Sequence, residues 1–474
     1  MDKDLQARQQ ARECARLSEQ AQKELARKEQ HQLDAIVEAV CAAFLQAAEP
    51  LAQMAVKETG FGNTADKVIK NQFASRTVLE AIRDMKTVGV LKEDEQTKLW
   101  EVGVPVGVIA AIVPSTNPTS TVCYKAMIAL KAGNTIVFSP HPKALNCTMR
   151  AAEIVAKAAE AAGAPAGSVQ CLSIPSMAGC QELMTAPEVR LILATGGPAM
   201  VKAAYSSGKP AIGVGAGNGP AYIHHSADVG RALDCILKSK TFDNGTVCAS
   251  EQSIIMEKAM EEKVKSAAKQ RGFYFMDSVQ AGKLAGLLFR PSGALNPEIV
   301  GKTAEFLAEK AGFTVPAGTK ILVAREQEAG PTRPYSMEKL CPVLAYFVME
   351  NEDAVLQKSI EVLQFEGSGH TFAMHANDKE AIRKFALQIP VSRFLVNTPA
   401  ALGGIGATTG LFPALTLGCG AVGGSSSSNN ISPLDLINIR RVAWGQDSPG
   451  MDEKQDWDPG LVELLTAKIL EKLK

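Results

Sequence analysis

A cysteine near the middle of the chain is the residue best suited to nucleophilic chemistry. Cys248 follows an Asn244-Gly245 turn and precedes a polar, then apolar, run that ends at Ile255. A thiol in such a loop can be reached by a substrate, and its thiolate is a strong nucleophile. The remaining cysteines are scattered, with neither a CxxC pair nor a histidine at metal-ligand spacing. The sequence therefore predicts a cysteine nucleophile and no metal site.

Composition limits the classes of partner. The chain has 474 residues, enough for two or three domains, with 46% hydrophobic and 21% charged residues. Lys+Arg and Asp+Glu balance at 50 each, which argues against nucleic acid and anionic membranes. The charged N-terminal residues 1–8 lack the apolar core of a signal peptide, and apolar runs stay below the ~18 residues of a membrane span. We expect a cytoplasmic protein in which most cysteines are buried apolar residues.

The first 104 residues read as helices followed by a hairpin. Residues 3–59 are rich in Ala, Gln, Glu, Lys and Leu, and predict two helices; a third covers about 66–84. The segments 87–91 and 98–104 flank an acidic turn, which predicts a β-hairpin over 87–104.

From residue 106 onward strands alternate with helices. The run 106–113 is continuously apolar, as expected of a strand buried on both faces. Further strands are predicted at 135–139, 168–174, 189–194 and 211–214, with helices at 119–131, 144–162 and 199–206. This alternation predicts a parallel, doubly wound sheet that binds ligands at the carboxyl ends of its strands. Gly196-Gly197-Pro198 lies at such an end, where a helix N-terminus can hold a pyrophosphate, although a plain tight turn has the same pattern.

The second half predicts another α/β unit and a tail. Strands are expected at 252–256, 320–324, 343–348 and 394–397, helices at 257–270, 278–287 and 351–363, and an edge strand at 439–444. Residues 446–459 read as a tether, and 461–474 as a short helix with one apolar face. We predict a cofactor-binding domain (1–220, with the hairpin), a catalytic domain (221–430), an oligomerisation strand (431–445) and a tethered amphipathic helix (446–474).

Several motifs in combination carry a resemblance to a known family. They are Ile112–Ser120, Phe138–Lys143, Ala194–Pro198, Gly208–Asn218 and the stretch around Cys248. Together they resemble the aldehyde dehydrogenase superfamily over residues 5 to 445. More narrowly, the chain is similar to the CoA-acylating branch: acetaldehyde and propionaldehyde dehydrogenases, and the aldehyde dehydrogenase half of bifunctional aldehyde-alcohol dehydrogenases.

The resemblance implies a chemistry for Cys248. Its thiolate would add to an aldehyde, and the resulting oxyanion would accept hydrogen bonds from the Cys248 backbone N–H and the Asn117 side chain. Hydride transfer to NAD would leave a thioester on the cysteine. The alternative interpretation of Asn117 is a turn former before Pro118.

The segment that matches the general base of hydrolytic relatives decides the expected product. Those relatives have a glutamate in a Glu-Leu-Gly-Gly motif, whereas this chain has Gly213–Asn218, without a carboxylate. A thioester with no base beside it survives until the thiol of coenzyme A takes the acyl group. His370 matches a histidine of acylating members and is expected to assist CoA deprotonation; a structural histidine is the alternative.

The resemblance also implies the cofactor site. Its expected residues are Pro114, Ser115, Ser139, His141, Gly196, Gly197, Gly215, Gly217 and Glu338. Glu338 would hold the nicotinamide ribose; its alternative interpretation is an exposed carboxylate at a helix end. Ser139 and Pro142 replace the Lys and Glu that grip the adenosine ribose in hydrolytic members, so NAD and coenzyme A are expected to share one cleft.

The expected substrate is an aldehyde of two or three carbons. Sulfoacetaldehyde is a rival substrate, with Arg393 as one pocket cation that cannot be placed from sequence. A hydrolytic enzyme and a non-catalytic scaffold are two competing interpretations of the whole chain. The resemblance implies a homo-oligomer, dimer or tetramer. It also implies that residues 460–474 bind shell or core proteins of a bacterial microcompartment and place the enzyme in its lumen, unless that helix docks on a neighbouring subunit.

Overall fold

Short apolar strands of the first half form a five-stranded parallel sheet. In the order β5-β4-β3-β6-β7 it contains β5 (Val169–Cys171), β4 (Ile136–Ser139), β3 (Val108–Ile112), β6 (Val189–Thr195) and β7 (Ala211–Val214). The chain adds strands on one side of β3 and then crosses to the opposite side, which confirms the predicted doubly wound sheet. The switch point lies between β3 and β6.

Helices cover both faces of this sheet because successive residues of a buried strand face opposite sides. Ile109 and Ala111 pack in a core with α2 (Gln30–Gln46), α6 (Pro118–Lys131) and α7 (Leu145–Ala161). Val108 and Ala110 pack instead with α1 (Lys3–Leu25), α8 (Met177–Thr185) and α9 (Pro198–Tyr205). The continuous apolar run in the sequence is therefore explained by burial on two sides.

The second half forms a seven-stranded parallel sheet, ordered β10-β11-β12-β9-β8-β13-β14. Its strands are β8 (Pro220–Ile223), β9 (Ser253–Glu257), β10 (Phe273–Phe275), β11 (Ile321–Arg325), β12 (Val343–Met349), β13 (Gly369–His375) and β14 (Val391–Val396). One face is covered by α10 (Val229–Thr241) and α11 (Glu261–Lys269), and the opposite face by α12 (Ser278–Leu288), α13 (Ala304–Lys310), α14 (Glu352–Phe365) and α15 (Lys379–Ala386). The helix α16 (Ala400–Gly404) follows β14.

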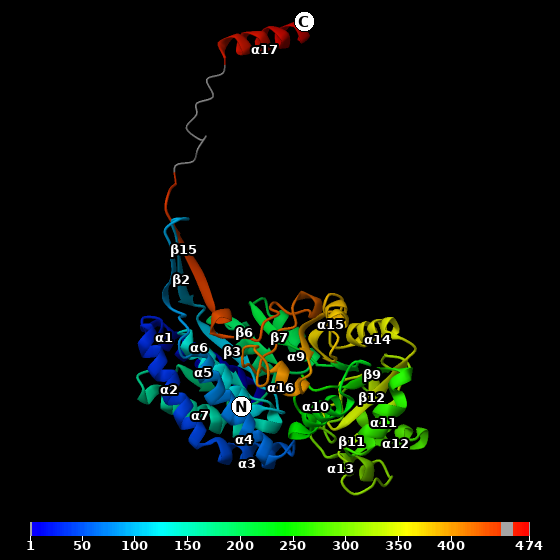
Figure 1. Cartoon of the computed structure of the whole chain (residues 1–474). Coiled ribbons are helices and arrows are strands. Elements are labelled where there is room, and N and C mark those ends of the chain that lie inside the picture. The colour runs from blue at the N-terminus through cyan, green and yellow to red at the C-terminus, as the bar shows by residue number, and fades with distance from the viewer. Residues whose placement is uncertain (1, 447–457, 474) are drawn as a thin grey trace.

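A three-stranded antiparallel sheet projects from the body as an arm (Figure 1). It contains the hairpin β1 (Gly89–Asp94) and β2 (Leu99–Pro105), which confirms the predicted hairpin, and β15 (Ile437–Ala443), which pairs with β2. Trp100 and Trp444 contact edge to face across it, 4.9 Å between ring centroids. The role of this arm in oligomerisation and the domain boundaries at 220 and 430 stay predictions.

The structure corrects the helical reading of the first 84 residues. The prediction of two helices within 3–59 is wrong, because α3 (Ala48–Thr59) follows a break at Ala47. The predicted helix at 66–84 is instead α4 (Thr64–Gln72), a π-helical turn η1 (Phe73–Thr77) and α5 (Val78–Ile82). The short 3₁₀ turns are η2 (Pro142–Ala144), η3 (Phe242–Gly245), η4 (Lys258–Met260), η5 (Pro334–Ser336), η6 (Ala421–Gly423) and η7 (Pro433–Leu436).

The computed structural model describes residues 2–446 and 458–473. Most of the predicted tether, 447–457, lies outside these ranges. The predicted terminal helix is present as α17 (Pro459–Lys472), and its apolar side chains are exposed. Within the described ranges, no single helix is both long and apolar enough to span a membrane. The pair α2 and α3 reaches that length only across a 63° bend, and the apolar residues of both helices are buried in the core.

Candidate active site

Loops from the two parallel sheets face each other where the first half of the chain meets the second. Asn117 and all the predicted cofactor residues except Glu338 lie at the ends of β3, β4, β6 and β7 or directly after them, at the carboxyl edge of the five-stranded sheet; Glu338 precedes β12. Cys248 precedes β9, and His370 is the second residue of β13, so both lie at the amino edge of the seven-stranded sheet. Residues 215–219 connect β7 to β8 and thus pass from one edge to the other.

Gly217, within that connection, brings three predicted site residues together. A Cβ at this position would lie 2.0 Å from the carbonyl oxygen of Cys248 and 3.0 Å from Cε1 of His370. The Gly217 N–H donates to Oε1 of Glu338 at 2.8 Å. Because Cys248, His370 and Glu338 arrive from three different elements, their juxtaposition could not be predicted from local sequence.

The environment of Cys248 opposes ionisation of its thiol. Cys248 is half-buried, and burial raises the pKa of the thiol to about 12. The charge of Glu338 raises that pKa further, whereas the positive charge of Arg393 lowers it. In this state the thiol is protonated at neutral pH, so nucleophilic attack requires a nearby proton acceptor.

Glu338 and His370 are both neutral at pH 7, for the same physical reason. Burial raises the pKa of Glu338 to about 8, and the charge of Glu366 adds to it, while the Gly217 N–H lowers it. Burial and Arg393 lower the pKa of His370 to about 3. The His370 ring contacts Thr371 Oγ1 through Nδ1 at 2.8 Å, and its Nε2 is buried without a partner among the described residues. Glu338 is half-buried and lies outside a helix, so its interpretation as an exposed helix-end carboxylate is wrong.

Asn117 is the N-cap residue of α6, but its side chain makes no hydrogen bond to the helix backbone. Its Oδ1 accepts a hydrogen bond from Lys70 Nζ at 2.6 Å, and its Nδ2 donates to Thr116 Oγ1 at 3.2 Å. Sequence reasoning missed Lys70, and also Asp243, to which Lys70 is bonded. A lysine on an N-terminal helix normally lies in solvent, so its burial carried no local signal.

The remaining predicted cofactor residues line the carboxyl edge of the first sheet. Gly197 is the N-cap of α9 and Pro198 its first residue. Pro198 has no N–H, and the N–H groups of Met200 and Val201 donate to the Gly197 carbonyl at 3.0 and 3.2 Å, so in the first turn the Ala199 N–H is left without an acceptor among the described residues. Among the described residues, nothing lies within 4 Å of a Cβ built on Gly197 or Gly215, which leaves room for a ligand against the backbone. This arrangement fits a dinucleotide pyrophosphate.

Four further predicted residues occupy neighbouring loops. Pro114 and Ser115 are half-buried after β3, and Ser139 ends β4, only 6% exposed. His141 is exposed and accepts a hydrogen bond from the Lys143 N–H through Nδ1, so it caps the turn η2; partial desolvation and the charge of Lys143 lower its pKa. Beside them an open cavity of about 710 Å³ is lined by Lys3, Gln6, Pro142, Leu145, Ser173, Ile174 and Pro175.

Arg393, on β14, packs against the Gly- and Ser-rich segment 418–430. It is 2% exposed, and its Nη2 donates to the carbonyl oxygens of Gly369 at 3.2 Å and Gly418 at 2.7 Å. Through these two bonds Arg393 links the 418–430 segment to β13. Its Nη1 and Nη2 are therefore bonded to oxygen atoms of the surrounding loops, whereas its Nε is buried without a partner among the described residues.

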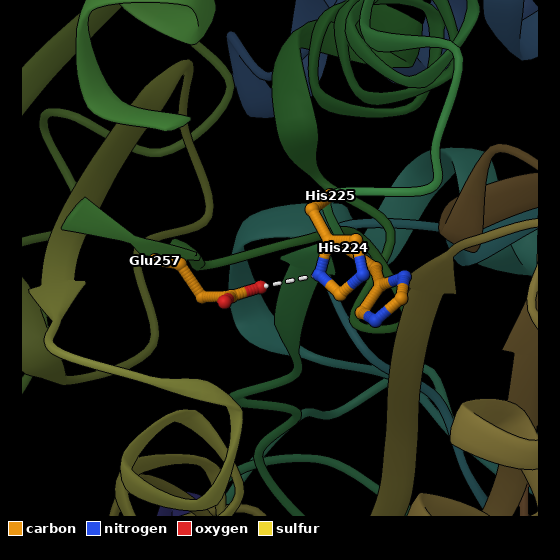
Figure 2. Close-up of side chains that lie close together, drawn as sticks. All are labelled: His224, His225 and Glu257. Carbon is orange, nitrogen blue, oxygen red and sulfur yellow. Dashed lines mark hydrogen bonds and ion pairs between the residues drawn. The ribbon is translucent and has the colours of Figure 1, made fainter. Parts of the chain in front are cut away.

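A cluster with metal-ligating side chains lies away from this site. His224 and His225 follow β8, and Glu257 ends β9; Figure 2 shows their side chains close together. The three thus lie at the carboxyl edge of the second sheet, whereas Cys248 lies at its amino edge. His225 Nδ1 contacts Glu257 Oε1 at 3.1 Å. His224 contacts Ser226 Oγ through Nδ1 at 2.7 Å and Glu352 through Nε2 at 3.1 Å. With both ring nitrogens of His224 engaged, we assign the cluster to hydrogen bonding between loops.

Comparison with known proteins finds the aldehyde dehydrogenase family over residues 4–282. The bifunctional aldehyde-alcohol dehydrogenase AdhE of Escherichia coli is 45% identical over 428 residues, covering 89% of this chain and 48% of the relative. The chain thus spans about half the length of the first curated relatives it matches. The succinate-semialdehyde dehydrogenase (acetylating) of Clostridium kluyveri is 38% identical, covering 90% of this chain and 93% of the relative.

Solved structures agree in fold. An acetylating aldehyde dehydrogenase from Geobacillus thermoglucosidasius matches with a TM-score of 0.92 and 47% identity, covering 94% of this chain and 99% of the relative. A propionaldehyde dehydrogenase from the fucose utilisation bacterial microcompartment of Clostridium phytofermentans has a TM-score of 0.82 and 28% identity, with coverage of 91% and 96%. A propionaldehyde dehydrogenase of Rhodopseudomonas palustris, with bound CoA and an acylated cysteine, has a TM-score of 0.82 and 28% identity, with coverage of 92% and 97%.

Proposed function

This chain belongs to the aldehyde dehydrogenase family, and from the arrangement around Gly217 we propose that it converts a short aldehyde, CoA and NAD to an acyl-CoA and NADH. The observation that carries the proposal is the identity of the groups beside Cys248. A hydrolytic enzyme needs an ionised base there, whereas this site has a glycine loop, a carboxyl group with a pKa near 8 and a neutral histidine.

Cys248 is the proposed nucleophile. As its sulfur forms a bond to the carbonyl carbon, its proton passes to a nearby acceptor. Glu338, hydrogen-bonded to the Gly217 N–H, is the proposed acceptor in its ionised form, which at a pKa of about 8 is a minor population at pH 7 and grows as the pH rises. The carbonyl oxygen then carries the negative charge, toward which the Cys248 backbone N–H and Asn117 Nδ2 would donate. NAD, when bound, accepts the hydride. The carbon–oxygen double bond re-forms, and the acyl group remains on Cys248 as a thioester.

The second half-reaction transfers the acyl group to CoA. The CoA sulfur attacks the thioester, and the Cys248 thiolate leaves. His370, neutral and with a free buried Nε2 within the described residues, is the proposed acceptor of the CoA proton. That proposal is supported by its position against Gly217, next to the Cys248 backbone.

The proposed holders of NAD are residues at the carboxyl edge of the first sheet and in the 215–219 connection, together with Glu338, which precedes β12 of the second sheet. They are Pro114, Ser115, Ser139, His141, Gly196, Gly197, Gly215, Gly217 and Glu338. The N-terminus of α9, where the Ala199 N–H is free of acceptors among the described residues, supports a pyrophosphate there, and the open surface at Gly197 and Gly215 supports close approach. CoA would use the same cleft after NADH has left.

One assay tests the reaction. Purified protein is mixed with acetaldehyde or propionaldehyde and NAD, with and without CoA, and NADH is followed by absorbance. We expect steady turnover only with CoA, and at most one NADH per subunit without it. Free acid formed at the same rate without CoA would instead establish a hydrolytic enzyme. Cys248→Ala should remove NADH formation, and full activity of that variant would rule out the assigned nucleophile.

A panel of aldehydes tests the substrate. We favour two- and three-carbon aldehydes over sulfoacetaldehyde because Arg393 Nη2 is bonded to the Gly369 and Gly418 carbonyl oxygens. Among the described residues this leaves the buried Nε without a partner, rather than a whole guanidinium that could bind a sulfonate. A higher kcat/KM for sulfoacetaldehyde than for propionaldehyde would reverse this preference.

We also propose a homo-oligomer and encapsulation in a microcompartment lumen. The first is supported by the unpaired outer edge of β15 among the described strands, and the second by the exposed apolar residues of α17 and by the microcompartment origin of one structural relative. Light scattering tests the oligomer. Deletion of residues 447–474 should leave activity intact and release the enzyme from shells; loss of the folded enzyme would instead support docking on the enzyme itself.

A further inference from the structure

Two buried lysines surround one buried aspartate between α4 and the loop before Cys248. Lys67 and Lys70 are each 3% exposed, and Asp243 is fully buried. The Oδ2 of Asp243 accepts hydrogen bonds from Lys67 Nζ at 2.9 Å and Lys70 Nζ at 2.5 Å. Buried charges of this kind are costly unless every one is paired and hydrogen-bonded, so the arrangement constrains the segments that supply them.

The backbone around Asp243 is held in an unusual conformation to make these contacts. Asp243 has φ 49° and ψ 37°, in the left-handed region that L-residues with a side chain avoid. A Cβ on Gly62 would lie 1.8 Å from Asp243 Oδ1, so that glycine makes room for the carboxylate. The Asn63 N–H donates to the same oxygen at 2.9 Å, and the Asp243 N–H donates to Asp66 at 2.7 Å. Strain of this kind persists where the surroundings hold it, and it is common at functional sites.

The ammonium of Lys70 is saturated by three acceptors. It donates to Asp243, to Oδ1 of Asn117 at 2.6 Å and to Oγ1 of Thr246 at 2.9 Å. An ammonium has three N–H donors and cannot accept, so Asn117 must present its oxygen to Lys70. The amide Nδ2 is the other branch of the same planar group; one of its two hydrogens is donated to Thr116 Oγ1 at 3.2 Å, which leaves the second for the oxyanion. Burial lowers the pKa of Lys70 to about 8, and the charge of Asp243 opposes this.

Lys70 also reaches the loop that ends in Cys248. Thr246 lies two residues before Cys248, and its hydroxyl donates to Asp243 Oδ2 at 2.6 Å while accepting from Lys70. The two groups expected to donate to the oxyanion are therefore both linked to one ammonium: the Asn117 amide directly, and the Cys248 backbone N–H through Thr246, two residues earlier in its loop.

We propose that Lys70 is a positioning residue of the acylating reaction, which fixes the Asn117 amide with its N–H groups toward the oxyanion and sets its place relative to the Cys248 loop. This inference rests on the proposed function. Lys70 also withdraws electron density from the Asn117 oxygen, which strengthens the Nδ2 hydrogens as donors.

Lys67 provides a matched control within the same cluster. It is equally buried and bonded to the same Asp243 oxygen, but its second bond goes to the Thr116 carbonyl at 2.9 Å and not to Asn117. A purely structural role of the cluster would make the Lys67→Met and Lys70→Met variants equivalent.

The test is a double-mutant cycle with Asn117→Ala, read as kcat for NADH formation in the presence of CoA. We expect Lys70→Met to lower kcat about 10- to 100-fold, since one oxyanion donor is worth about 10²–10³-fold. KM for the aldehyde should change little. In the Asn117→Ala background the same Lys70→Met change should have no further effect on kcat, because Lys70 acts through Asn117. Lys67→Met should lower kcat less, and its effect should multiply with that of Asn117→Ala, as expected of two independent changes.

Two further measurements separate positioning from misfolding. Alkylation of Cys248 by iodoacetamide needs no oxyanion, so its rate should stay within about twofold in Lys70→Met. Lys70→Gln, which keeps an N–H donor toward Asn117, should recover part of the lost kcat. If Lys70→Met does not fold, Lys70→Gln and Lys70→Arg carry the same cycle in both backgrounds.

Three results would overturn the role of Lys70. These are effects of Lys70→Met and Asn117→Ala that multiply, equal kcat losses in Lys67→Met and Lys70→Met, or a parallel fall in kcat and alkylation rate. Wild-type protein that oxidises no aldehyde would instead refute the proposed function, which keeps the two failures distinguishable.

Discussion

Replacement of Gly217 by alanine should disable the site without removing a functional side chain. The added Cβ would lie 2.0 Å from the Cys248 carbonyl oxygen and 2.9 Å from its carbon. Contacts under about 3 Å are not tolerated between a Cβ and backbone, so the two loops must separate by roughly 1 Å. A displacement of about 1 Å between a nucleophile and its partners costs on the order of 10²-fold in rate, or about 2.7 kcal/mol in the activation barrier.

The assay is kcat for NADH formation with propionaldehyde and saturating CoA and NAD, beside thermal unfolding. We expect Gly217→Ala to lose about 10²-fold in kcat while remaining folded, since the change lies in loops at the edges of both sheets. Gly282→Ala is the control, because within the described residues nothing lies within 4 Å of a Cβ built there. If Gly217→Ala keeps more than half of the wild-type kcat, the close approach of the 213–218 loop to Cys248 does not matter for catalysis.

Three more expectations follow from the same geometry. The pKa of Glu338 is about 8 in the folded chain, above its ordinary value of 4.5. Between these two pH values the folded chain keeps a proton that the unfolded chain has lost. The free energy of unfolding should therefore fall as the pH rises from about 4.5 to about 8. Glu338→Gln should flatten this slope in denaturant titrations, by up to about 1.4 kcal/mol per pH unit, and an unchanged slope would contradict the burial of that carboxyl. His370→Ala should slow CoA-dependent turnover about 10- to 100-fold while leaving the first burst of NADH. Because the pKa of His370 is about 3, the pH–rate profiles of this variant and of the wild type should show the same ionisations between pH 5 and 8. Treatment with EDTA should leave NADH formation unchanged, because the cluster of His224, His225 and Glu257 lies at the opposite edge of the sheet from Cys248; a loss restored by zinc would show that the cluster binds metal.

Strands were predicted correctly from sequence where their composition or the turn beside them already indicates a strand. The apolar run 106–113 is buried on both faces as β3, and the hairpin is marked by its acidic turn. In contrast, β13 contains a glycine and two histidines, and β8 begins with a proline, so neither resembles a core strand until its neighbours are known. Tertiary packing there outweighs strand propensity.

The site divided along similar lines. Cys248 and Asn117 could be selected because their motifs are local, and Gly217 because a glycine run permits close approach. The partners that hold them arrive from distant segments: Lys70 lies 47 residues from Asn117 and 173 from Asp243. Such pairs are created by the fold, and a lysine three residues from another on a helix normally indicates a solvated face.

The pairing of β15 with β2 bears on how the protein is made. The whole seven-stranded sheet is inserted in the chain between β7 and the return segment, and that segment packs back on the first sheet: Asn134 Nδ2 donates to the Leu436 carbonyl at 2.8 Å, and Ser425 donates to Gly213 at 3.0 Å. When the ribosome has synthesised the chain through β7, it has therefore not yet synthesised β15, the strand that pairs with β2. The first unit must wait, with an open strand edge, until more than 200 further residues have emerged, from Val214 to Ile437. Chains that stop within the second unit should consequently aggregate rather than leave a folded cofactor-binding half.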